Sequence, residues 1–135
     1  MSYIPEPLRR LVYDRANGHC EYCLLAARYA YFPYEIDHII AEKHGGQTDA
    51  DNLCLSCFEC NRYKGSDLAS YDQETGEIVR LFHPRRDQWA EHFRIEGEYL
   101  MPLTPVGRVT VKLLQFNKHE RLTERAQLLA SGNYP

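Results

Sequence analysis

Two pairs of cysteines, each separated by two residues, are the strongest chemical signal in the sequence. They are Cys20-Glu-Tyr-Cys23 and Cys57-Phe-Glu-Cys60. Four thiolates in this pattern are typical of a tetrahedral structural zinc site. The 33 residues between the pairs exceed the spacing of a simple zinc ribbon, so the zinc would tie the start of the domain to a later helix. The alternatives are a redox-active pair and cysteines that are merely buried.

An acid and a base stand side by side in the isoleucine-rich segment 35–40, EIDHII. A core strand would exclude both, because a buried charge is costly unless it is paired or bound to a metal. Asn61 directly follows Cys60, so the zinc would hold it rigidly. Asp37 and Asn61 then offer hard oxygen ligands suited to Mg²⁺ or Mn²⁺, and His38 could take a proton from water nearby. The objection is that consecutive strand residues point to opposite faces.

Short helices and strands are predicted to position these residues. Segments 35–40 and 53–55 read as strands, and a helix capped by Ser56 is expected from about Cys57 to Gly65. Further helices are expected at about 7–17, around Trp89, from Thr104 onward and at about 119–130, and strands flank the turn at 74–77. We predict one small α+β domain over residues 1–135, with a core at 18–66 and an accessory hairpin and helices at 67–135.

Composition and length indicate a globular chain of about one domain, with 26% charged and 44% hydrophobic residues among 135. No apolar run approaches the roughly 18 residues needed to cross a membrane, and the segment MSYIPEPLRR has no signal-peptide core. We therefore expect a cytoplasmic protein without membrane contact, in which the thiols stay reduced.

The distribution of charge is more informative than the net charge of −3. Residues 80–125 hold nine basic and six acidic residues, whereas residues 35–65 hold three basic and six acidic ones. An acidic segment beside a basic one would suit a metal site next to an anion-docking surface. Ordinary solvated charge is the alternative interpretation.

The motifs EYC, EIDHII, HGG and DNLCLSCFECNRYKG, taken in order over residues 20–65, resemble the HNH endonucleases. The core of that family is a ββα-metal fold, in which two strands and a helix surround one catalytic ion. The resemblance implies that Asp37 is a metal ligand, that His38 is the general base and that Asn52 braces the loop and orients the base. The third family position, often histidine, is Asn61 here, and its amide oxygen would be a ligand.

The resemblance further implies a metal-dependent endonuclease that hydrolyses DNA phosphodiester bonds, with structural Zn²⁺ and a catalytic Mg²⁺ or Mn²⁺. DNA contacts are expected mainly at phosphates. The side chains expected to make them are Arg62, Lys64, His44, Arg85, Arg86 and Arg108. A non-catalytic zinc-stapled nucleic-acid-binding module and a protein-interaction domain are the alternatives. The sequence leaves open whether the protein is a monomer or a homodimer.

Overall fold

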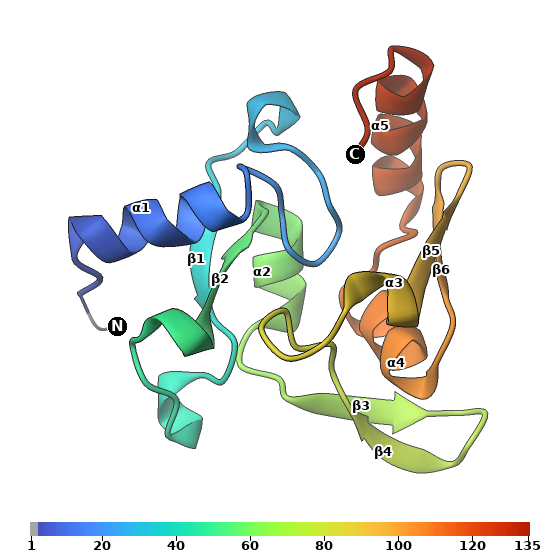
Figure 1. Ribbon diagram of the computed structural model, residues 1–135. Coiled ribbons are helices and arrows are strands. Elements are labelled where there is room, and N and C mark those ends of the chain that lie inside the picture. Colours follow the sequence, from blue (N-terminus) through green and yellow to red (C-terminus); the bar gives the residue numbers. More distant parts are fainter. Residues whose placement is uncertain (1–2) are drawn as a thin grey trace.

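A computed structural model describes residues 3–135 and shows short helices around three antiparallel strand pairs (Figure 1). The helices are α1 (Glu6–Arg15), α2 (Phe58–Lys64), α3 (Trp89–His92), α4 (Pro105–Leu113) and α5 (His119–Ala130). The strand pairs are β1 (Glu35–His38) with β2 (Leu53–Ser56), β3 (Ala69–Asp72) with β4 (Glu77–Arg80), and β5 (Phe93–Glu96) with β6 (Tyr99–Pro102). Short 3₁₀ turns lie at Ala27–Tyr29, Glu42–His44 and Ala50–Asn52. The predicted α+β class is confirmed.

The hairpin β1–β2 lies between α1 and α2 (Figure 1). Leu53 and Leu55 are buried in a small cluster with Val12 of α1. Asp37 instead faces α2, where it meets Lys64. The two faces of this hairpin therefore differ in character, as the alternation of side chains along a strand requires, and the polar face points to α2.

The start of α2 is set by a cysteine rather than by the predicted serine. The sulfur of Cys57, the N-cap residue, accepts a hydrogen bond from the Cys60 amide at 3.4 Å. Ser56 donates its hydroxyl to the Cys57 carbonyl instead, so the prediction of Ser56 as the cap is wrong. The helix ends at Lys64, and Gly65 follows with φ of +52°, a conformation that favours glycine.

The helix α4 begins as predicted. The Thr104 hydroxyl accepts from the Gly107 amide at 3.0 Å, and Pro105 occupies the first helical position. A β-carbon on Gly107 would come within 2.2 Å of the His92 carbonyl oxygen. Glycine at this position therefore permits the close approach of α4 to the end of α3.

The hairpin β5–β6 was not predicted from the sequence. Its strands are joined at Gly97, which has φ of +60°. Within residues 3–135, no helix combines the length and the apolar character that a membrane span requires. The larger core cluster surrounds the four paired cysteines and includes Phe82, Phe93 and Phe116, so the accessory elements share a core with the cysteine knuckles.

Candidate functional site

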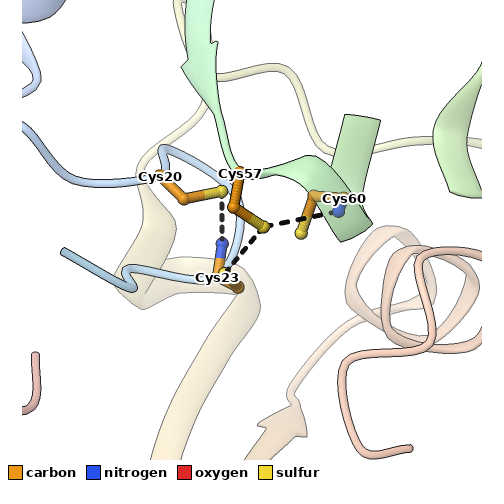
Figure 2. A group of neighbouring side chains, drawn as sticks. All are labelled: Cys20, Cys23, Cys57 and Cys60. Carbon is orange, nitrogen blue, oxygen red and sulfur yellow. Dashed lines mark hydrogen bonds between the residues drawn. The ribbon is translucent and has the colours of Figure 1, made fainter. Parts of the chain in front are cut away.

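The four paired cysteines converge on one buried point (Figure 2). Cys20 and Cys23 come from the loop after α1, and Cys57 and Cys60 from the start of α2. Their sulfur atoms all lie within 4.8 Å of one another, and those of Cys23 and Cys57 are 3.7 Å apart. A Zn–S bond of about 2.3 Å gives a tetrahedron edge of about 3.8 Å. The four sulfurs therefore fit one zinc ion.

The thiols of this cluster do not ionise alike. Hydrogen bonds from neighbouring thiols, that of Cys20 first, lower the pKa of Cys23 well below its usual value. Burial raises the pKa of Cys60. Because a metal takes thiolates, zinc binding must release the protons that such buried thiols hold.

A buried arginine from α5 completes the surroundings of the cluster, and it was not identified from the sequence. The Arg121 guanidinium lies 3.2 Å from the Cys60 sulfur and 3.8 Å from the Cys57 sulfur. It is held there by a 2.8 Å hydrogen bond to the Leu114 carbonyl. Four thiolates around Zn²⁺ would carry a net charge of −2, and this cation would offset part of that charge. No spacing rule could have revealed the contact, because 61 residues separate Arg121 from Cys60.

Asp37 is buried in a polar cluster on the α2 side of β1. Its Oδ2 accepts the Tyr22 hydroxyl at 2.8 Å and lies 3.1 Å from the Lys64 ammonium. The Cys54 thiol is also close, at 3.7 Å. The carboxylate is thus enclosed by a hydroxyl, a thiol and an ammonium group.

His38 lies at the end of β1 and faces away from this cluster. Its Nε2 is 2.8 Å from the Thr48 hydroxyl and 3.9 Å from the Glu42 carboxylate. Thr48 and Glu42 also line an open polar hollow of about 430 Å³, together with Gly45, Gly46 and Gln47. The side chains of Asp37 and His38 therefore lie on opposite faces of β1, as alternation predicts. His38 contacts two residues that line the hollow, whereas Asp37 is buried on the α2 side.

The two candidate asparagines have different surroundings. Asn52 accepts from the Ile40 amide at 2.9 Å and donates to the carbonyls of Ile40 and Gln47, each at 2.9 Å. This side chain therefore ties the loop back to the end of β1. Asn61 is half-buried on α2, and its side chain has no hydrogen-bond partner within residues 3–135. Its amide oxygen thus remains available to an external ligand.

The basic residues expected at a DNA surface divide into two groups. Three are engaged in ion pairs within the protein: Lys64 with Asp37, Arg85 with Glu21, and Arg108 with Asp72 and Glu74. Arg62, Arg86 and His44 are exposed. The Arg62 guanidinium lies over the Phe58 ring at 5.8 Å, and His44 Nε2 is 3.0 Å from the Ser66 carbonyl. Of the four arginines expected to contact DNA, only Arg62 and Arg86 are exposed.

The site thus consists of a β-hairpin packed on a helix that begins at a four-cysteine knuckle, with an aspartate and a histidine at adjacent strand positions. Residues 20–67 match the family model described as HNH endonuclease. Comparison with curated proteins and with solved structures found no match in either set.

Proposed function

We propose that this protein is a metal-dependent HNH endonuclease that hydrolyses DNA phosphodiester bonds. The observation that carries the proposal is the state of His38 within the segment that matches the HNH family model. Its imidazole is fixed by Thr48 beside an open polar hollow, and the neighbouring loop is tied down by Asn52. An oriented imidazole next to a solvent-accessible surface is what a general base for water requires.

Each polar side chain has a distinct part in the proposed reaction. Thr48 occupies Nε2 of His38, so we assign to Nδ1 the proton taken from the attacking water. Asp37 and the amide oxygen of Asn61 would hold Mg²⁺ or Mn²⁺, both being hard oxygen ligands. That ion would supply charge neutralisation at the phosphate and at the leaving 3′ oxygen. Arg62 and Arg86, both exposed, would bind neighbouring phosphates without reading sequence.

The proposed structural zinc and the proposed cellular location both rest on the cysteine side chains. Structural Zn²⁺ would occupy the four-cysteine cluster, whose sulfurs are within 4.8 Å of one another. None of the five cysteines forms a disulfide within residues 3–135, which is the usual state in a reducing compartment, and we place the protein in the cytoplasm on this ground. We further propose that residues 67–135 belong to the same domain, because Tyr134 donates to the Cys23 carbonyl at 2.5 Å.

Nicking of supercoiled plasmid with Mg²⁺ or Mn²⁺ tests the proposal. His38→Ala should lower the nicking rate about 10²–10⁴-fold, the usual contribution of a general base. His119→Ala is the matched control, because His119 is an exposed histidine at the start of α5 and has no part in the proposed site. Zinc content and melting temperature should stay unchanged in both. A His38→Ala protein that nicks at nearly the normal rate would rule out His38 as the base.

One observation favours a second candidate, a zinc-stapled DNA-binding module without catalysis. The Asp37 carboxylate is already neutralised by Lys64 at 3.1 Å, so the domain is charge-balanced at this position without a divalent ion. The same experiment separates the two functions. DNA binding without nicking in Mg²⁺, Mn²⁺, Ni²⁺ or Co²⁺ would favour the binding module.

A further inference from the structure

The Lys64–Asp37 ion pair is unusual in being almost completely buried. The two side chains are 2% and 5% exposed, and the Lys64 ammonium lies within 3.4 Å of both carboxylate oxygens. The ammonium also donates to the His38 carbonyl at 3.3 Å. Lysine is almost never buried without a partner, and withdrawing two charges from water costs stability that their attraction only partly restores. Such a pair is not expected on grounds of stability alone.

The ammonium occupies the position that a divalent cation would need. It contacts the carboxylate of the proposed metal ligand and a second hard oxygen, the carbonyl of the proposed base residue. Two cations cannot share these oxygens without strong repulsion, because the interior screens charges weakly. The donor set therefore fits a metal ion, but only after the ammonium has moved away.

The position of Lys64 at the end of α2 allows its ammonium group to move away from Asp37. A cavity of about 70 Å³ beside Lys64 is lined by Asp67, by the basic residues Arg80 and His83, and otherwise by apolar side chains. Lys64 is the last residue of α2 and precedes Gly65, and Asp67 donates its amide to the Lys64 carbonyl at 2.9 Å. The long flexible stem of lysine can carry the ammonium from one carboxylate to another, or to the surface.

We propose that Lys64 is a resident counter-ion of Asp37 that excludes the catalytic ion until DNA draws the ammonium away. This inference rests on the proposed function for the identity of Asp37 as a metal ligand. A backbone phosphate bound beside Asp37 attracts both the displaced ammonium and the incoming cation. Binding of DNA and binding of the ion are therefore mutually reinforcing, since coupling between two ligands is reciprocal. Without DNA, the ion binds weakly and the nuclease stays inactive.

Calorimetric titration of the zinc-loaded, full-length protein with Mn²⁺ in the absence of DNA tests the exclusion. Lys64→Met keeps an unbranched apolar stem and removes the competing charge, so its Mn²⁺ affinity should rise at least tenfold over wild type. Lys64→Arg is the matched control, because it keeps a cation at Asp37 and should bind as weakly as wild type. Asp37→Asn should abolish the signal. Equal or weaker Mn²⁺ binding by Lys64→Met would overturn the inference.

A second measurement on the unaltered protein covers the case in which Lys64→Met fails to fold. A buried, ion-paired ammonium should give one protected Nζ resonance in proton–nitrogen correlation spectra recorded at low temperature. That resonance should disappear as Mg²⁺ is added, and at lower Mg²⁺ when a short DNA duplex is present. A resonance that persists at saturating Mg²⁺ would refute displacement.

These outcomes are independent of whether the protein cuts DNA. Tighter Mn²⁺ binding by Lys64→Met, together with a wild type that never nicks, would support the counter-ion role and reject the endonuclease. Nicking that depends on His38, together with unchanged Mn²⁺ binding in Lys64→Met, would support the endonuclease and reject the counter-ion role of Lys64.

Discussion

Asn52 and Asn61 are both asparagines of the same domain, but the hydrogen bonds of their side chains differ. Asn52 makes three hydrogen bonds that join Ile40 and Gln47. A β-carbon on Gly46 would lie 2.8 Å from the Asn52 amide nitrogen and 1.7 Å from the Ile40 carbonyl oxygen. The loop therefore closes tightly on this side chain. Asn61 has no such attachment within the described part of the chain.

The first prediction contrasts these two residues. Asn52→Ala should lower the free energy of unfolding by on the order of 1–3 kcal/mol, since each hydrogen bond contributes about 1 kcal/mol. Asn61→Ala should leave it nearly unchanged, yet lose Mn²⁺ affinity. Thermal denaturation and Mn²⁺ titration with DNA present measure both quantities. Equal destabilisation by the two variants would show that Asn61 also has a structural role.

Ion preference provides a second prediction at this scale. Asp37 and Asn61 offer oxygen ligands, which favour Mg²⁺ and Mn²⁺, whereas an imidazole nitrogen favours Ni²⁺ or Co²⁺. Asn61→His should therefore move the ion profile of nicking towards Ni²⁺ or Co²⁺ while zinc content stays constant. Identical profiles for both proteins would mean that residue 61 does not bind the ion.

Among the elements, β3–β4 and α4 are joined by an ion pair rather than by apolar packing alone. The Arg108 guanidinium donates to both oxygens of Asp72, at 3.0 and 2.9 Å, and also contacts Glu74. The Asp72 carboxylate further accepts the Thr75 hydroxyl at 2.8 Å. Arg108 is therefore engaged in holding the hairpin on the helix, and its positive charge is already balanced by two acids.

A test of the docking surface should accordingly use exposed arginines. Arg86→Glu should weaken DNA binding for all sequences alike and reduce the salt dependence of affinity by about one phosphate contact. Arg108→Glu should instead lower the melting temperature, because it sets three carboxylates together. Binding assays at several salt concentrations and thermal denaturation distinguish the two effects. An Arg86→Glu protein with unchanged salt dependence would remove Arg86 from the surface.

The same ion pair has a pH dependence. Hydrogen bonding to Arg108 lowers the pKa of Asp72 below its usual value. The pair therefore contributes stability at pH values above the pKa of an unfolded aspartate, about 3.9, and this contribution is lost as the pH falls towards the lowered pKa. The difference in unfolding free energy between wild type and Asp72→Asn should be constant above about pH 5 and shrink below about pH 4. A constant difference down to pH 2 would contradict this account.

Elements whose signals are local could be predicted from the sequence. The last helix was expected at about 119–130 and is His119–Ala130, and Thr104 caps α4 as its hydroxyl and the following proline suggest. The grouping of Cys20, Cys23, Cys57 and Cys60 into one cluster could also be predicted from their spacing in the sequence. Partnerships made across the fold could not be predicted. Lys64 was expected to hold a phosphate at the surface, and only the packing of α2 against β1 buries it on Asp37.

At the scale of the whole molecule, residues 67–135 contact the two cysteine knuckles at three points. Trp89 donates its indole nitrogen to the Tyr22 carbonyl at 2.9 Å, Arg121 contacts the Cys60 sulfur, and Tyr134 donates to the Cys23 carbonyl. Residues 67–135 therefore surround the knuckles rather than extending away from them.

The rate of zinc release tests whether the cysteine cluster depends on contacts from residues 67–135. Arg121→Met should release zinc to a chelator several-fold faster than wild type, because it removes the cation beside the thiolates. Arg125→Met is the matched control. Arg125 is also buried but bonds the carbonyls of Glu98 and Phe116 rather than sulfur, so its loss should lower stability with less effect on zinc release. Equal release rates for the two variants would show that only general stability matters.

The contacts of Arg121 and Tyr134 with the cysteine knuckles also bear on how the chain is made. Synthesis supplies all four cysteines by residue 60, but the guanidinium beside them emerges 61 residues later and the Tyr134 hydroxyl later still. During that interval a growing chain can gather zinc without the cation and the hydroxyl that enclose it. The finished metal site is therefore a property of the completed fold, and a ribosome-bound HNH segment should exchange its zinc more readily than the released protein.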